Sequence, residues 1–283
     1  MPTAIPLPFG VSQYTTRHAS FESDLAVYPQ SGASWIEVCE FKLDPHNVEV
    51  QLRGCPIQIS SVQPTVHTIY PDSLAAEPAD PAQRSSLIRR AMERIGPYVP
   101  PLTPFVVNTG IAPNGNFREG WRVVEKECRE LADFAAERGL RIAMEPLNPI
   151  LMNTNSFIWT LDQAMHLVNA VNRPNFGICV DFWNDWQDPL VLDALARCGD
   201  RIYVVHVSDW HLPRAFADRA GIGTGEIPFS DLLCAVRSAG YAGPYMLEIF
   251  SDDSLPDSLW KQDGRSVIES SREALERAWS ESF

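Results

Sequence analysis

The stretch FGICVDFW (residues 176–183) is an apolar run that one carboxylate, Asp181, interrupts close to its end. Three further segments have the same form: RIAMEPL (141–147), IYVVHVSD (202–209) and YMLEIF (245–250). Strands that are apolar along nearly their whole length are typical of parallel sheets, because helices and neighbouring layers bury both of their faces. These four segments therefore predict consecutive strands of a parallel α/β sheet.

Outward from this stretch, apolar runs alternate with amphipathic segments over almost the whole chain. The predicted strands are 9–16, 34–43, 56–62, 105–110, 141–147, 176–182, 201–208 and 245–250. The predicted helices are 21–29, 85–98, 118–138, 161–171, 189–197, 229–239 and 265–280. Thr160 before a helix and Pro189 in a first turn are typical start signals. Residues 63–84 are rich in Pro, Asp and Ala, and are predicted to be a long loop of the kind that usually carries function.

Eight strands in alternation with helices predict an α/β protein with a single (β/α)8 TIM barrel, and we expect residues 1–283 to form one domain. An open doubly wound sheet would have equally buried strands. However, no GxGxxG motif follows the first strand, and no GxxxxGK[ST] motif occurs. Gly221, Gly223 and Gly225 follow no strand directly and are interpreted as a loop. The pattern therefore favours the closed barrel.

Composition excludes several classes of protein. The chain has 283 residues, 45% of them hydrophobic, and a formal net charge of -13, so we expect no nucleic-acid partner. No apolar run reaches the ~20 residues of a membrane span, and the first residues lack the pattern of a signal peptide. We therefore expect a cytoplasmic protein with no membrane contact. The six cysteines include no CxxC pair and are predicted to be reduced core thiols.

Four residues interrupt the late apolar strands at equivalent places: Glu145, Asp181, His206 and Glu248. One buried carboxylate alone is as readily explained by an ion pair or a helix cap. Four on successive strands are a different case, because the C-terminal ends of barrel strands meet at one mouth. Three carboxylates so close together need a cation to remain ionised. The set predicts one divalent metal ion, Mn²⁺ first, with Mg²⁺, Co²⁺ or Zn²⁺ as alternatives.

The chain resembles the xylose isomerase-like TIM barrels, the sugar phosphate isomerase/epimerase superfamily. The segments that carry the resemblance are MEPLNP, VDFWND, VVHVSDW, GIGTGEIPFSDLL and GYAGPYMLEIF, in this order. The resemblance implies that Glu145, Asp181, His206 and Glu248 hold the metal. It also implies that Glu145 and Glu248 are catalytic, on opposite faces of the substrate, and move its proton through a metal-stabilised enediolate.

Substrate contacts are expected from residues near these ligands. Many family members have a histidine three positions after the aspartate, but this chain has Asn184, which hydrogen-bonds without titrating. An arginine after the metal histidine often grips the substrate, and Arg214 or Arg219 is the candidate here. His67, just past the third strand, is either a pocket residue or a surface one. Trp183 is expected to pack on the sugar or at the barrel rim.

Four more residues are candidates for roles at the site or the barrel rim. Asp209 either orients the His206 imidazole or is a helix N-cap or turn residue. Trp186 and Trp210 contact substrate, cover the rim or form a subunit interface, and Trp260 is a candidate lid residue.

The leading hypothesis is a metal-dependent sugar isomerase or epimerase that acts on a ketose-like polyhydroxylated carbonyl substrate. The alternative keeps the metal and the barrel but eliminates a β-leaving group. The enzyme is then a dehydratase or lyase for a keto-inositol, a 3-dehydroshikimate-like compound or a 3-keto-glycoside. Asn184 and Asn148, both close to ligands, favour this outcome. A non-catalytic sugar-binding barrel would predict a broken ligand set. The expected partner is a small sugar-like molecule, and a homo-oligomer is an open alternative.

Overall fold

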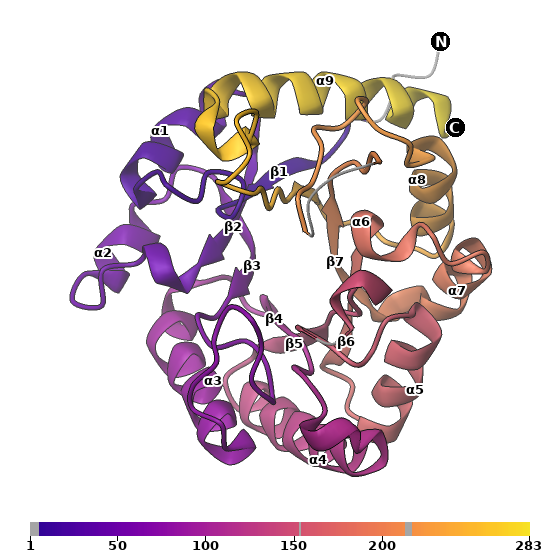
Figure 1. Cartoon of the computed structure of the whole chain (residues 1–283). Helices are drawn as coiled ribbons and strands as arrows, with labels where there is room; N and C mark the ends of the chain where they lie inside the picture. Colours follow the sequence, from indigo (N-terminus) through magenta and orange to yellow (C-terminus); the bar gives the residue numbers. More distant parts are fainter. Residues whose placement is uncertain (1–5, 153, 213–216) are drawn as a thin grey trace.

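Eight parallel strands close into a barrel, in which each strand pairs with the next and β8 pairs with β1. The structure is a computed structural model that describes residues 6–152, 154–212 and 217–283. Viewed along the barrel, the strands form the inner ring and the helices surround them (Figure 1). The strands are β1 (Phe9–Ser12), β2 (Trp35–Cys39), β3 (Gln58–Gln63), β4 (Pro104–Val107), β5 (Arg141–Met144), β6 (Phe176–Asp181), β7 (Ile202–Val207) and β8 (Tyr245–Leu247). The predicted (β/α)8 TIM barrel is confirmed.

Helices cover the outside of the barrel, and α9 lies between α8 and α1 where the ring closes (Figure 1). The described helices are α1 (Phe21–Gln30), α2 (Val48–Arg53), α3 (Pro81–Ile95), α4 (Phe117–Ala136), α5 (Leu161–Val171), α6 (Phe182–Asp185), α7 (Val191–Cys198), α8 (Phe229–Ser238) and α9 (Gly264–Glu281). Among the described residues, no helix is both long and apolar enough to cross a membrane.

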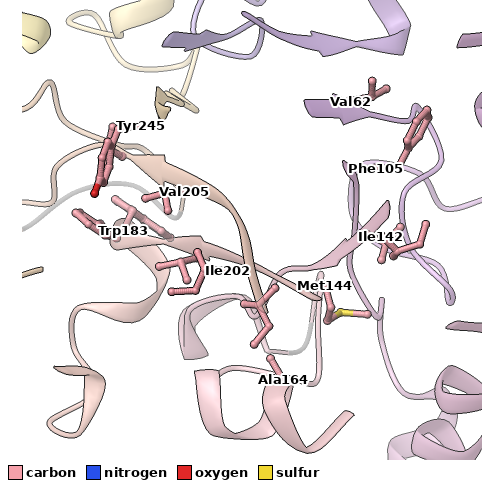
Figure 2. Packing of buried hydrophobic residues seen from close by; sticks show 14 of the residues in the cluster. Val62, Phe105, Ile142, Met144, Ala164, Trp183, Ile202, Val205 and Tyr245 are labelled. Carbon is pink, nitrogen blue, oxygen red and sulfur yellow. The ribbon is translucent and has the colours of Figure 1, made fainter. Parts of the chain in front are cut away.

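Side chains alternate along each strand between the helix layer and the barrel interior, as the two-residue period of a strand requires. Apolar residues on the outer face join one large core with the helices. Figure 2 shows Val62, Phe105 and Ile142 of this core on their strands, and Ala164 on α5. A second, small cluster of Val106, Ala143, Cys179 and Val204 fills the interior. Residues in phase with this interior cluster point into the barrel.

The predicted first residues of the helices agree with the structure better than the predicted last residues of the strands do. Helix α5 has the predicted bounds, and the side chain of Thr160 accepts a hydrogen bond from the backbone N–H of Gln163. Every strand except β3 ends one to four residues earlier than predicted, because the chain leaves the sheet at the mouth and continues as loops. The Pro189 start signal is wrong: α7 begins at Val191, since the chain first makes a turn at Asp188.

Two further expectations need correction. Helix α3 starts at Pro81, capped by Asp80, so the loop after β3 is shorter than predicted. All six cysteines are free, but only four are buried: Cys234 is exposed on α8 and Cys55 is half-buried. The prediction of core thiols is wrong for these two. Cys234 lies on the solvent face of the amphipathic helix α8, and Cys55 lies in the connection between α2 and β3.

Candidate metal centre and substrate pocket

The four predicted ligands meet at the mouth of the barrel. Asp181 ends β6 and His206 lies in β7, while Glu145 and Glu248 directly follow β5 and β8. One donor atom from each lies within 4.8 Å of the others. Their exposed fractions are at most 5%. All four are in phase with the interior residues of their strands, so the alternation of the sheet alone brings them together.

An arginine occupies the space between two of these carboxylates. Arg219 Nη2 lies 2.8 Å from Asp181 Oδ2, and Nη1 lies 3.1 Å from Glu248 Oε2. Its guanidinium carbon lies 5.0 Å from the ring centre of Trp183 and 5.1 Å from that of Phe250. Arg219 is one of the two arginines considered from the sequence. Arg214, the other, lies outside the described residues.

Amide side chains orient the carboxylates through hydrogen bonds. Gln63 Nε2 donates to Glu248 Oε1 at 2.9 Å, and Asn108 Nδ2 donates to Glu145 Oε2 at 3.2 Å. Asn184 Nδ2 donates to Asp181 Oδ2 at 2.7 Å. Each carboxylate therefore keeps a fixed rotamer, which is a requirement for a preorganised site.

A fourth carboxylate of the cluster, the buried Glu37 on β2, contacts the histidine from the opposite side. Its Oε2 lies 2.9 Å from His206 Nε2 and accepts a hydrogen bond from Ser61 Oγ at 2.6 Å. His206 Nδ1 faces the other way, 3.3 Å from Glu145 Oε1 and 3.4 Å from Glu248 Oε2. Sequence reasoning missed Glu37, although it interrupts the apolar segment WIEVC as the four predicted ligands interrupt theirs.

Burial shifts the acidities of these groups. Desolvation raises the pKa of Glu248 to about 8, although His206 and Arg219 oppose the rise. Desolvation also raises the pKa of Asp181, against the charge of Arg219. For Glu37, burial acts in the same direction, but the charge and hydrogen bond of His206 outweigh it and lower its pKa. The mouth thus combines carboxyl groups whose pKa is raised, Glu248 and Asp181, with one whose pKa is lowered, Glu37.

A cavity of about 160 Å³ opens directly over the cluster. The charged residues of its lining include Glu145, Glu248 and Arg219. Amide and hydroxyl side chains also line it: Gln63, Asn108, Asn155 and Ser73. Its apolar lining consists of Tyr14, Leu74, Leu147, Leu151, Trp183, Ala217 and Phe250. A pocket with one polar, charged end and largely apolar walls is the usual form of a small-molecule site.

Three of the predicted substrate contacts lie at this cavity or directly beside it. His67 lines it and is only 6% exposed; its Nε2 lies 3.5 Å from Asp72 Oδ2, and its Nδ1 has no hydrogen-bond partner among the described residues. Trp183 also lines it, and its backbone N–H donates to Asp181 Oδ1. Asn184 lies behind Asp181 and accepts a hydrogen bond from the backbone N–H of Asn148.

Asp209 does not contact the His206 imidazole in any described hydrogen bond; it makes a turn. Its carboxylate accepts hydrogen bonds from the backbone N–H groups of Trp210, Gly223, Gly225 and Ile227. The backbones of Asp209 and Ala220 also form two mutual hydrogen bonds. Asp209 therefore anchors the loop that carries Arg219.

The remaining tryptophans pack at the rim. The rings of Trp183 and Trp210 lie 5.0 Å apart, and those of Trp186 and Trp210 lie 6.4 Å apart. Trp260 donates its ring N–H to the carbonyl oxygens of Tyr14 and Ile249, so it joins the loops after β1 and β8. These contacts fix the shape of the cavity wall.

The barrel and its buried acidic cluster define a class of protein, and the sequence matches that class over most of its length. Residues 30–277 match the family of xylose isomerase-like TIM barrels. The chain therefore belongs to this family.

Individual relatives are more distant. An L-ribulose 3-epimerase of Methylomonas is 25% identical over 239 residues, which cover 81% of this chain and 78% of that enzyme. A 3-dehydroshikimate dehydratase of Pseudomonas aeruginosa is 32% identical over 168 residues, 53% of this chain but only 25% of that enzyme. A solved structure described as IOLI protein with a binding zinc atom has a TM-score of 0.76 and 19% identity, covering 98% of this chain and 99% of that one. At this identity the structural match supports the fold alone.

Proposed function

We propose that this protein is a divalent-metal-dependent isomerase or epimerase that acts on a ketose-like polyhydroxylated carbonyl compound. The observation that carries the proposal is the convergence of Glu145, Asp181, His206 and Glu248 on one buried point beneath a cavity. The name of the Methylomonas relative, an L-ribulose 3-epimerase, supports the same reaction class.

The donor set fits a divalent cation. Three carboxylates and one imidazole suit Mn²⁺ best, with Mg²⁺, Co²⁺ or Zn²⁺ as alternatives. The ion pairs of Arg219 are with Asp181 and Glu248, and among the described residues Glu145 has no ion-pair partner except His206. A cation held by these four residues would balance their excess negative charge.

Glu145 and Glu248 are the proposed catalytic residues. A divalent cation here would polarise the substrate carbonyl and the neighbouring hydroxyl, which acidifies the C–H bond between them. One carboxylate takes that proton and leaves an enediolate; the other, coming from a strand three positions away around the barrel, returns a proton from its own side. Without a cation, burial raises the pKa of Glu248 to about 8; a cation held beside it would lower that pKa again, so that the carboxylate is ionised and can accept a proton.

The surrounding residues are proposed to bind the substrate and exclude water. Arg219 and the unpartnered His67 Nδ1 offer hydrogen-bond donors or acceptors to hydroxyl groups. Trp183 offers a flat apolar face to sugar C–H groups. Asn184 acts by holding Asp181, and it reaches Glu145 Oε1 only at 3.5 Å.

The test combines metal analysis with two isosteric variants. Purified protein is expected to bind one equivalent of Mn²⁺, and Glu145→Gln and Glu248→Gln are each expected to lower kcat by at least 10²-fold. Glu226→Gln, at an exposed position on the loop after β7, is the matched control and should keep full activity. Full activity in both site variants, or no stoichiometric divalent cation, would overturn the proposal.

A dehydratase or lyase is the second candidate, in which the enediolate loses a β-leaving group. Asn184 and Asn148 favour it, because they bond each other beside Asp181 where a titrating histidine is common in the family. The dehydratase name of the Pseudomonas relative supports it too. Keto sugars, ketoinositols and 3-keto-glycosides assayed with Mn²⁺ in deuterated water distinguish the two. Solvent deuterium beside the carbonyl without loss of a leaving group favours isomerisation, and an enone favours the lyase.

A further inference from the structure

We infer that Glu37 is a positioning residue that keeps the His206 imidazole in its Nε2–H tautomer, so that the Nδ1 lone pair faces the cation site. This inference rests on the proposed metal-dependent function and adds a residue to it. Glu37 does not line the cavity and makes no described contact with the other three ligands; its described side-chain partners are His206, Ser61 and Gln63.

The two ring nitrogens of His206 face different surroundings. Nε2 lies 2.9 Å from Glu37 Oε2, within ordinary hydrogen-bond distance. Nδ1 lies 3.3 Å from Glu145 Oε1 and 3.4 Å from Glu248 Oε2, on the side where the four donor atoms converge. Only Nδ1 is therefore placed to be a ligand.

Glu37 is held so that it can only accept. Ser61 Oγ donates to its Oε2 at 2.6 Å, and Gln63 Nε2 donates to its Oε1 at 3.3 Å. Glu37, Ser61 and His206 are fully buried, so no bulk water offers other partners. Nδ1 also faces carboxylate oxygens, those of Glu145 and Glu248, but a cation held by these two residues would take the place of a proton there. A neutral imidazole would then keep its proton on Nε2, because a bare Nε2 would bring its lone pair against the Glu37 carboxylate.

Cys179 is a further neighbour of the ring and a weak competitor for its protons. Cys179 Sγ lies 3.5 Å from Nδ1 and 3.9 Å from Nε2. A thiol is a weak donor and a weak acceptor, so it cannot outweigh a carboxylate. A ligand histidine whose second nitrogen donates to a carboxylate is also a more basic and better-oriented ligand.

The variant Glu37→Gln reverses the hydrogen bond without removing volume. Because Gln63 donates to Oε1, the new amide oxygen is expected at that position, and the new NH2 group then faces Ser61 Oγ and His206 Nε2. Nε2 becomes an acceptor, and the proton moves to Nδ1, where it blocks coordination. Ser61→Ala is the matched control, because it removes a bond to Glu37 but leaves the carboxylate against His206.

Two measurements test the inference on the whole chain. Calorimetric titration with Mn²⁺ is expected to show affinity about 10- to 100-fold weaker for Glu37→Gln than for wild type, and a change below threefold for Ser61→Ala. In ¹⁵N-labelled protein loaded with Zn²⁺, the ring signals that His206→Gln removes are expected to show a proton on Nε2. The measurement on Zn²⁺-loaded wild type needs no substitution at Glu37. It therefore tests the tautomer of His206 even if Glu37→Gln does not fold.

The outcomes separate the two proposals. If wild type binds Mn²⁺ and Glu37→Gln binds it with equal affinity, the role of Glu37 is overturned and the proposed function stays intact. A proton on Nδ1 in the Zn²⁺-loaded wild type does the same. Wild type without affinity for either metal overturns the proposed function and this inference together.

Discussion

Glu248 makes the stability of the metal-free protein depend on pH in a direction opposite to that of most carboxylates. Its pKa rises from an ordinary value of 4.5 to about 8 because burial disfavours its charged form. A folded-state pKa above the unfolded value means that the folded state holds the proton more tightly. The stabilisation is fully present below about pH 4.5 and is lost as the pH rises through about 8. The gap corresponds to about 5 kcal/mol in the free energy of unfolding.

Glu248→Gln removes the ionisable group and keeps its shape. The variant should therefore not show the fall in the free energy of unfolding that the ionisation of Glu248 causes as the pH rises. Urea denaturation of chelator-treated wild type at about pH 5 and about pH 8.5 gives two free energies of unfolding, and the same pair is measured for the variant. The wild-type free energy should fall by several kcal/mol more than that of Glu248→Gln, since most of the titration lies between these pH values. At the higher pH, Mn²⁺ at 100 times its Kd should raise the free energy of unfolding of wild type by about 3 kcal/mol. If the two proteins change in parallel to within about 1 kcal/mol, the account of Glu248 is wrong.

Three other perturbations test the scaffold around the site. Asp209→Ala removes the acceptor for four backbone N–H groups of the loop that carries Arg219, so it should raise KM or lower kcat by about 10-fold or more while circular dichroism still shows a folded barrel. Gly110→Ala should destabilise by at least about 2 kcal/mol in urea denaturation, because Gly110 has φ +74° and a Cβ there would lie 2.0 Å from the carbonyl oxygen of Tyr70; soluble protein of unchanged stability would contradict this. Thr160→Ala should cost about 1 kcal/mol through loss of the α5 cap, whereas Thr160→Ser should cost almost nothing.

The barrel and its four central residues could be predicted from one physical fact. Burying Glu145, Asp181, His206 or Glu248 is expensive, so each appears as an interruption in an apolar strand. Strand alternation and the common direction of the strands then place all four at one mouth. The ends of the strands were less predictable, because residues past the barrel rim stay apolar while they line the pocket, as Phe250 does.

Contacts between distant strands could not be predicted. Glu37 follows the same rule as the four ligands, but its partner His206 is 169 residues away and no local pattern joins them. Arg219 lies in a loop whose path depends on the anchor at Asp209, so counting residues from His206 left two candidate arginines. The orientation of Asn184 toward Asp181 also depends on a contact with Asn148 from the preceding loop.

The loop after β7 keeps Arg219 in place through backbone hydrogen bonds with the barrel. Asp209 and Ala220 are bonded to each other, and the backbone N–H of Arg219 donates to the carbonyl oxygen of Phe250, so both ends of the segment 210–218 are attached to the barrel. Arg219 also forms its own ion pairs with Asp181 and Glu248, so we expect sequence changes between these attachments to leave it over the acidic cluster. An engineer can therefore exchange this part of the mouth to alter substrate preference without rebuilding the catalytic centre, and natural variation among barrels of this kind can follow the same route.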